Sequence, residues 1–183
     1  MIETRRLRLR QWRGEDRDPF YALNADPAVM EHFPGLLSRG QSNRLADALA
    51  DHIATHGWGL YAVEEKKSGA FVGFVGLNRV GFEAHFTPAV EIGWRLARRY
   101  WGKGYASEAA RASIAYAFET IGLDGLVSFT AVANRRSRQV MERIGMTRDP
   151  DGDFLHPKLP ADHPIAPHVL YRLSAADWRR DRP

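Results

Sequence analysis

Hydrophobic positions in the first third of the chain predict one strand followed by two helices. Leu7 and Leu9 alternate with arginines, the period-two pattern of a half-buried strand. Farther on, Leu45, Leu49 and Ile53 recur every four residues, the spacing of one helix face, and a glycine follows the pattern. The predicted elements of this part are a strand at 6–12, a helix from about 15 to 24 and a helix at 41–55.

The rest of the chain returns to strand patterning and then alternates strands with helices. Two apolar runs flank Lys66-Lys67-Ser68-Gly69, which predicts a β-hairpin. A long amphipathic stretch ends at Gly122, a residue that suits a helix C-terminus. The predicted elements here are strands at 60–63, 71–77, 87–96, 126–132, from 146 onward and at 168–173, with helices at 104–121 and 136–144.

This order, βααβββαβαββ, predicts an α/β (α+β) fold with one mixed, mostly antiparallel sheet and helices packed on it. Hairpins join the early strands, and a strand–helix–strand crossover follows them. No repeat, linker or low-complexity segment divides the 183 residues, so we expect a single domain over 1–183.

Composition excludes several function classes. The chain has no cysteine, which rules out disulfides, thiolate metal sites and a cysteine nucleophile. No apolar run is long enough to span a membrane and no signal peptide is evident, so we expect a soluble, cytoplasmic protein without a membrane partner. The net charge of +4 comes from 22 scattered arginines and four lysines, which favours a solvated surface over nucleic-acid binding. Two local clusters suit a small polyanion: Arg95, Arg98, Arg99 and Lys103, and Arg135, Arg136 and Arg138.

A turn with two glycines stands between a predicted strand and the longest predicted helix. Gly102 and Gly104 would let a ligand approach the main chain, and the helix N-terminus that follows favours an anion such as phosphate. An ordinary strand-to-helix turn is the alternative. The segment is not a P-loop, because no Gly-Lys-Ser/Thr string occurs in it, and it lacks the third glycine of a dinucleotide-binding fingerprint.

The stretch Arg99–Gly104 resembles the pyrophosphate loop of the GNAT acyltransferase superfamily, Gln/Arg-x-x-Gly-x-Gly/Ala. The context, Glu91–Leu96 before the loop and Tyr105–Ala109 after it, is similar to the RimJ/RimL-like branch of ribosomal-protein N-terminal acetyltransferases. The opening Glu3–Arg10 and the segment Asn134–Met146 extend the resemblance over 3–147. It implies a sheet splayed at the cofactor site, helices on both faces, and transfer of acetyl from acetyl-CoA to a primary amine by direct attack.

The resemblance also assigns the donor site. It implies that the backbone of Trp94, Arg95 and Leu96 pairs with the pantetheine arm. The pyrophosphate would lie on the loop beside Arg99, and the loop consists of Trp101, Gly102, Lys103, Gly104, Tyr105 and Ala106. Asn134 matches an asparagine near the pantetheine arm, and asparagine is equally a good helix N-cap, so both interpretations stand.

Acetyl transfer to an amine needs a base and an acid for the leaving thiolate. Glu91, on the strand before the loop, is the candidate base; a surface carboxylate is the alternative, and Glu31 is the next candidate. The family's usual leaving-group tyrosine is replaced by Met141, which cannot donate a proton. Ser137 stands where the ribosomal-protein branch has a serine near the sulfur, although it also suits the first turn of a helix.

The acceptor side is the least defined. The family places the loop around Val29–Gly35 at the acceptor pocket, and the acceptor is then a protein N-terminus or a small amine. The proline-rich segment 154–168 carries histidines in no known metal spacing, so we expect a rigid lid and no metal. A non-catalytic acyl-CoA-binding or regulatory module is the alternative function. The sequence allows a monomer or a homodimer.

Overall fold

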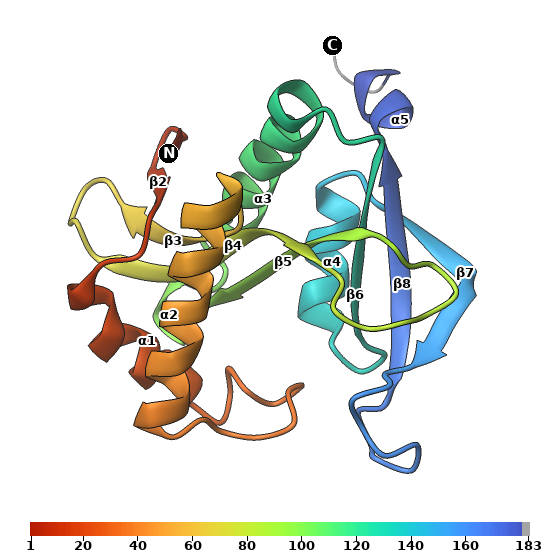
Figure 1. The fold of residues 1–183 in the computed structure, drawn as a ribbon, viewed down its shortest axis with the longest axis horizontal. Coiled ribbons are helices and arrows are strands. Elements are labelled where there is room, and N and C mark those ends of the chain that lie inside the picture. Colours follow the sequence, from red (N-terminus) through yellow and green to blue (C-terminus); the bar gives the residue numbers. More distant parts are fainter. Residues whose placement is uncertain (181–183) are drawn as a thin grey trace.

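The computed structural model describes residues 1–180, which form one eight-stranded sheet with helices against it (Figure 1). The strand order across the sheet is β1-β2-β3-β4-β5-β6-β8-β7. The strands are β1 (Ile2–Glu3), β2 (Leu7–Arg10), β3 (Leu60–Glu65), β4 (Phe71–Arg79), β5 (Val90–Leu96), β6 (Gly125–Ala131), β7 (Thr147–Leu155) and β8 (Pro167–Ser174). The α-helices are α1 (Arg17–Asn24), α2 (Arg39–His56), α3 (Tyr105–Ala115), α4 (Arg135–Arg143) and α5 (Ala175–Arg180).

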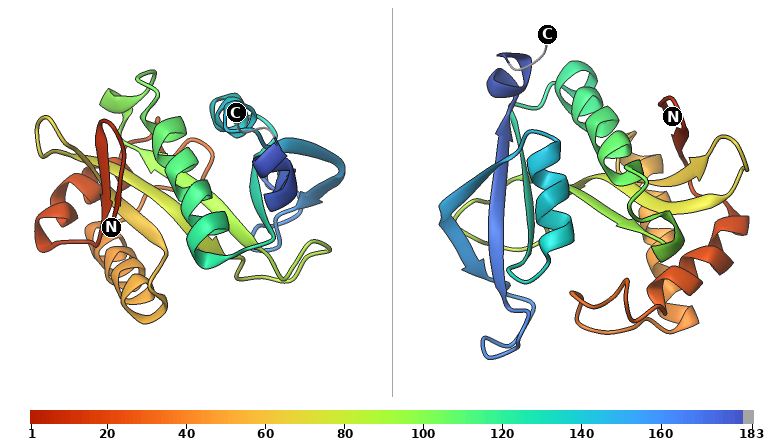
Figure 2. Two further views of the ribbon diagram at one scale, coloured as in Figure 1. Left: turned by 90° about the horizontal axis from the view of Figure 1, so that it is seen from above. Right: turned by 180° about the vertical axis from the view of Figure 1, so that it is seen from behind.

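The sheet divides between β5 and β6. These two strands run parallel and share one registered pair, Glu91 with Val127, whereas all other neighbours are antiparallel. Beyond that pair the strands separate, so β1–β5 and β6–β8 form two halves with an opening between them (Figure 2). The predicted splay is therefore present, and it occurs at Glu91.

Helices cover both faces of the first half. α1 and α2 pack on one face and α3 on the other, while α4 lies beside β6–β8 on the side of α3 (Figures 1 and 2). Ser38 caps the start of α2, with its hydroxyl accepting a hydrogen bond from the Gln41 N–H, and Gly57 caps the end in the left-handed region. β3 and β4 lie between these layers, and their side chains are almost all buried.

The predicted element order and fold class are confirmed, with three differences. The short strand β1, which pairs with β2, and the C-terminal helix α5 were not predicted. The predicted helix 104–121 ends its α-helical part at Ala115 and continues as a π-helical segment, Tyr116–Ile121. Apolar periodicity cannot distinguish the two helix types, because both bury one face. Within residues 1–180, no helix is both long and apolar enough to cross a bilayer.

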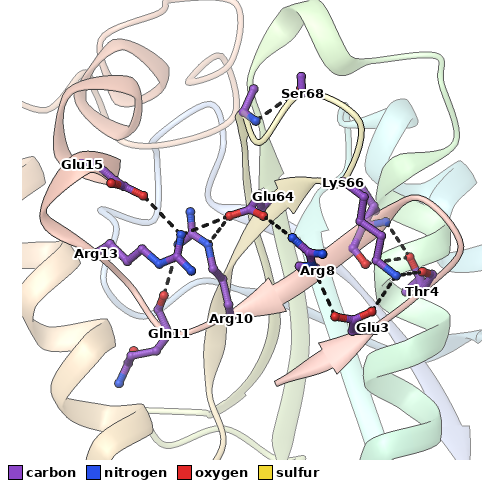
Figure 3. A network of polar contacts seen from close by, with 12 residues as sticks. Glu3, Thr4, Arg8, Arg10, Gln11, Arg13, Glu15, Glu64, Lys66 and Ser68 are labelled. Carbon is purple, nitrogen blue, oxygen red and sulfur yellow. Dashed lines mark hydrogen bonds and ion pairs between the residues drawn. The ribbon is translucent and has the colours of Figure 1, made fainter.

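A buried ion network joins β2 and β3 to the turn before α1. Arg10 is 4% exposed and donates to both oxygens of Asp16, at 2.7 and 2.9 Å, and to Glu64 Oε2 at 2.7 Å. Figure 3 shows Arg10 beside Glu64, with Arg8 approaching the same carboxylate from the surface. The Arg10 hydrogen bond is the main cause that holds the pKa of Glu64 below its ordinary value. Buried carboxylates of this kind are stable only while their cation is present.

Arg10→Met is expected to lower the free energy of unfolding by about 3–5 kcal/mol, because it leaves two buried carboxylates without their main partner. Arg8→Met is the matched control: the Arg8 side chain is 44% exposed and contacts Glu64 at 3.2 Å, so its loss should cost about 1 kcal/mol or less. Urea denaturation of the two variants measures the difference. Equal losses would show that burial of the Arg10 network contributes nothing special.

Candidate active site

The opening between β5 and β6 continues into a cleft of about 1580 Å³. Its walls come from parts of the chain that lie far apart in the sequence. Both halves of the sheet contribute, as do the loop between α1 and α2 and the loop between β7 and β8. Among the predicted site residues, those that line the cleft are Glu91, Trp94, Arg95, Leu96, Trp101, Gly102, Gly104, Tyr105, Ala106, Asn134 and Ser137.

One end of the cleft is the glycine turn that precedes α3. Gly102 and Gly104 have φ angles of 73° and 76°, in the left-handed region that residues with a Cβ rarely adopt. Gly104 caps α3, so the first N–H groups of this helix have no partner within the helix. Because the turn lines the cleft, these N–H groups and the helix dipole form a site suited to phosphate.

A clamp from the N-terminus holds this turn in place. Glu108 in the first turn of α3 accepts hydrogen bonds from Thr4 Oγ1 at 2.6 Å and from the Arg6 N–H at 2.8 Å, and it pairs with Arg6 Nε at 2.6 Å. Arg6 also donates to the Lys103 carbonyl at 3.0 Å. Thr4 and Arg6 could be assigned from the sequence only to a family resemblance, since nothing local indicates a contact with a helix a hundred residues away.

Two of the predicted phosphate ligands are not at the cleft wall. The Arg99 guanidinium lies over the Tyr100 ring at 4.9 Å, and the Lys103 ammonium lies over the same ring at 5.3 Å. Both residues are exposed beside the glycine turn and do not line the cleft. Their contact with a phosphate stays a prediction.

β5 presents different groups on its two faces and at its edge. The Ala97 N–H donates to Val72 O, and the Val80 N–H donates to Ala89 O. In an antiparallel pair every second residue bonds to the partner strand, so the N–H and C=O of Arg95 point toward Phe74 on β4. The backbone groups of Trp94 and the N–H of Leu96 then point toward the β6 side, where the strands separate. Of the three backbone contacts predicted for the pantetheine arm, those of Trp94 and Leu96 fit this geometry and that of Arg95 does not.

Glu91 lies at the splay, on the face of β5 toward α1 and α2. It is half-buried, and burial raises the pKa of its carboxyl to about 8. Gly93 follows on the same face, and a Cβ there would lie 3.8 Å from Glu91 Oε1. The missing side chain therefore keeps the cleft open directly beside the carboxyl. A carboxyl of raised pKa in a cleft is typical of a proton-transfer group.

Asn134 and Ser137 lie together at the start of α4, across the cleft. Asn134 Oδ1 accepts a hydrogen bond from the Ser137 N–H at 3.2 Å, and Asn134 Nδ2 donates to Thr130 Oγ1 at 2.9 Å. The N-cap interpretation of Asn134 is thus confirmed, and its contact with a ligand stays a prediction. Met141 is 1% exposed and packs in the core, so it has no place at the site.

Histidines of the β7–β8 segment form a further wall. The rings of His156 and His168 are in contact at a tilt of 50°, with centroids 4.9 Å apart, and both residues line the cleft. Burial is the main cause that lowers the pKa of each, which favours the neutral ring. Among residues 1–180, no group of three or more His, Asp or Glu side chains is arranged to hold a metal ion. The expected lid is thus a wall of the cleft built from loop and strand.

The loop between α1 and α2 reaches across the cleft to α4. Val29, His32 and Phe33 line the cleft, and Glu31 lies 3.9 Å from Arg136 Nη1. Arg136 in turn stacks on Trp101 at 4.6 Å. Glu31, the second candidate base, lies on the exposed side of this loop in an ion pair.

Comparison with known proteins agrees with this geometry. The acetyltransferase (GNAT) domain model matches residues 6–147. An uncharacterised protein of Bacillus subtilis, YkkB, is 36% identical over 148 residues, covering 79% of this chain and 84% of that protein. The ribosomal protein uS5-alanine N-acetyltransferase of Escherichia coli is 26% identical over 125 residues, covering 68% of this chain and 60% of that protein, which supports the link to the RimJ/RimL-like branch. A crystal structure of an acetyltransferase from Agrobacterium tumefaciens aligns with a TM-score of 0.74 and 30% identity, covering 94% of this chain and 92% of that one.

The family model spans well over half of the chain, and its matched segment contains the glycine turn, Glu91 and Asn134. The resemblance in sequence, the splayed sheet and the cleft at the splay all lead to one conclusion. This chain belongs to the GNAT family and is an acetyltransferase.

Proposed function

We propose that this acetyltransferase transfers acetyl from acetyl-CoA to a primary amine by direct attack of the amine on the thioester. The observation that carries the proposal is the position of Glu91. Its carboxyl lies at the splay, inside the same cleft that has the phosphate-binding turn at its other end. A donor that spans the cleft would bring its thioester to this carboxyl.

The donor side fits acetyl-CoA in three respects. The glycine turn Trp101–Gly104 and the first turn of α3 offer N–H groups to the pyrophosphate. The free edge of β5 offers the backbone of Trp94 and Leu96 to the pantetheine arm. Cationic side chains that line the cleft, among them Arg111 and Arg143, suit the remaining phosphate.

Proton transfer then follows from the two sides of the splay. An alkylammonium must lose a proton before it attacks, and the Glu91 carboxylate accepts it, directly or through water. The resulting oxyanion is stabilised by N–H groups at the edge of β5. When the carbon–sulfur bond breaks, the thiolate takes a proton, and the Ser137 hydroxyl at the opposite wall is the group that relays it.

A non-catalytic acyl-CoA-binding module would need the glycine turn but no carboxyl of raised pKa at the splay. The test is release of free thiol from acetyl-CoA in the presence of a panel of small amines and N-terminal peptides. Amine-dependent thiol release supports the proposal. Tight binding of acetyl-CoA without turnover of any amine would favour the binding module.

The glycine turn gives a first prediction for this proposal. Gly104→Val should weaken CoA binding by about 10-fold or more, because a branched side chain cannot keep the left-handed φ that aims the helix N–H groups at the phosphate. Gly122→Val is the matched control, since Gly122 has a φ of 79° at the other end of the same helical segment, outside the cleft. Calorimetry with CoA measures both variants. Equal affinities for CoA would contradict the assignment of the turn.

Glu91→Gln tests the base. We expect kcat/KM for the acceptor to fall by about 100-fold or more while CoA affinity stays the same, because glutamine keeps the shape but cannot accept the proton. In the wild type, kcat/KM should rise with pH through about 8 as Glu91 loses its proton. In the variant, only the amine titrates, so high pH should restore part of the rate. Wild-type turnover and pH dependence in Glu91→Gln would place the base elsewhere.

The same carboxyl supplies a readout that needs no substrate. Its pKa is raised in the folded protein, so its contribution to stability is present below pH of about 4.5 and is lost as pH rises to about 8. As pH rises from about 4.5 to about 8, the free energy of unfolding of Glu91→Gln should therefore increase relative to that of the wild type. A difference that does not change with pH would show that Glu91 is an ordinary surface carboxylate.

A further inference from the structure

Arg95 carries a charge that its surroundings do not balance. Its side chain leaves β5 on the same face as Glu91 and lines the cleft. The guanidinium lies over the Phe33 ring at 3.9 Å and near the Phe74 ring at 5.3 Å. Its one hydrogen bond runs from Nη1 to Asn24 Oδ1, at 2.7 Å, and that partner is neutral.

Across residues 1–180, no carboxylate forms an ion pair with Arg95, and its Nε is enclosed by protein without a partner. Burial alone lowers the pKa of this guanidinium to about 10, so it is still charged at neutral pH. A buried cation without a counterion is costly, and proteins normally pair it. The contrast with Arg10, which has two carboxylates, lies within the same molecule.

A chain of buried polar groups holds the guanidinium in position. Asn24, at the end of α1, donates from Nδ2 to Ser42 Oγ at 3.0 Å, and both residues are 0% exposed. Asn24 thereby turns its oxygen toward Arg95. The rings of Phe33 and Phe74 fix the plane of the guanidinium, and Nη2 remains as the nitrogen that can meet a ligand in the cleft. A planar donor fixed in this way is suited to a carboxylate.

We propose that Arg95 binds a carboxylate of the acceptor, so that the enzyme acetylates primary amines that also carry a carboxylate. This inference rests on the proposed function, because it takes Glu91 as the group that meets the amine. Glu91 and Arg95 share one face of β5 with Gly93 between them, so their Cα atoms are about 13 Å apart. The amine and the carboxylate of the acceptor are therefore separated by several bonds. A polyamine would instead bring a second cation to Arg95 and be repelled.

The experiment compares matched acceptors with free thiol release as the readout. The set consists of ω-aminocarboxylates of roughly three to eight carbons, their ω-amino amides and the corresponding diamines, so that only the distal group differs. At the best chain length we expect kcat/KM for the aminocarboxylate to exceed that for the amide by about 10-fold or more and that for the diamine by a larger factor. This comparison uses the wild type alone and does not depend on the folding of any variant.

Arg95→Gln then assigns the preference to this residue. In the variant, the ratio of kcat/KM for the aminocarboxylate to kcat/KM for the amide should fall to within about 3-fold of one. Arg44→Gln, which removes an exposed arginine from α2 outside the cleft, is the control for a general loss of positive charge and should keep the preference. A variant that lowers kcat/KM for all three acceptors equally, or a wild type without preference among them, would overturn the proposal while leaving acetyl transfer intact.

Calorimetry separates this inference from the proposed function. Binding of the aminocarboxylate to the CoA-loaded protein should be about 10-fold weaker in Arg95→Gln than in the wild type, whether or not any acceptor turns over. Unchanged affinity would count against Arg95 as the carboxylate site. Absence of turnover with selective binding would refute the proposed chemistry and retain the binding site.

Discussion

The site depends on one constraint in the sheet: β5 and β6 pair at a single position and then separate. A parallel pair that continued would satisfy the backbone groups of Trp94 and Leu96 internally and close the cleft. Because it stops at Glu91, the edge of β5 is available to a ligand, and the carboxyl lies where the opening begins. The crossover helix α3 also starts at this opening, so the glycine turn and Glu91 belong to one strand–turn–helix unit.

Buried charged side chains are paired in the body of the fold but not in the cleft. Arg10, Asp16 and Glu64 are buried and fully paired, and they join β2, β3 and the turn before α1. Glu91 and Arg95 are on the cleft face of β5 and lack such partners within the described chain. Burial therefore raises the pKa of Glu91 and lowers the pKa of Arg95. Unpaired groups of this kind cost stability in the free protein and are retained where a ligand completes them. In the proposed reaction, the substrate supplies the partners of these two side chains.

Local patterns predicted the framework, because strand alternation, helix periodicity and turn glycines are written in neighbouring residues. The order of elements, the glycine turn and the position of Glu91 before it could all be read in this way. The polar contacts of the cleft residues could not, because these contacts are long-range. Arg95 meets Asn24 from 71 residues away, and Glu31 reaches Arg136 on α4. The pairing of the Arg95 backbone with β4 could not be predicted either, since it follows from the register of the two strands.

A crystal structure of the CoA complex tests most directly whether the splay is the donor site. We expect the pantetheine arm to enter between β5 and β6 with hydrogen bonds to the backbone of Trp94, the pyrophosphate to lie on the turn Trp101–Gly104, and the sulfur to point toward Glu91. Binding of CoA on another surface, with the strands at the splay unoccupied, would contradict the assignment of this cleft.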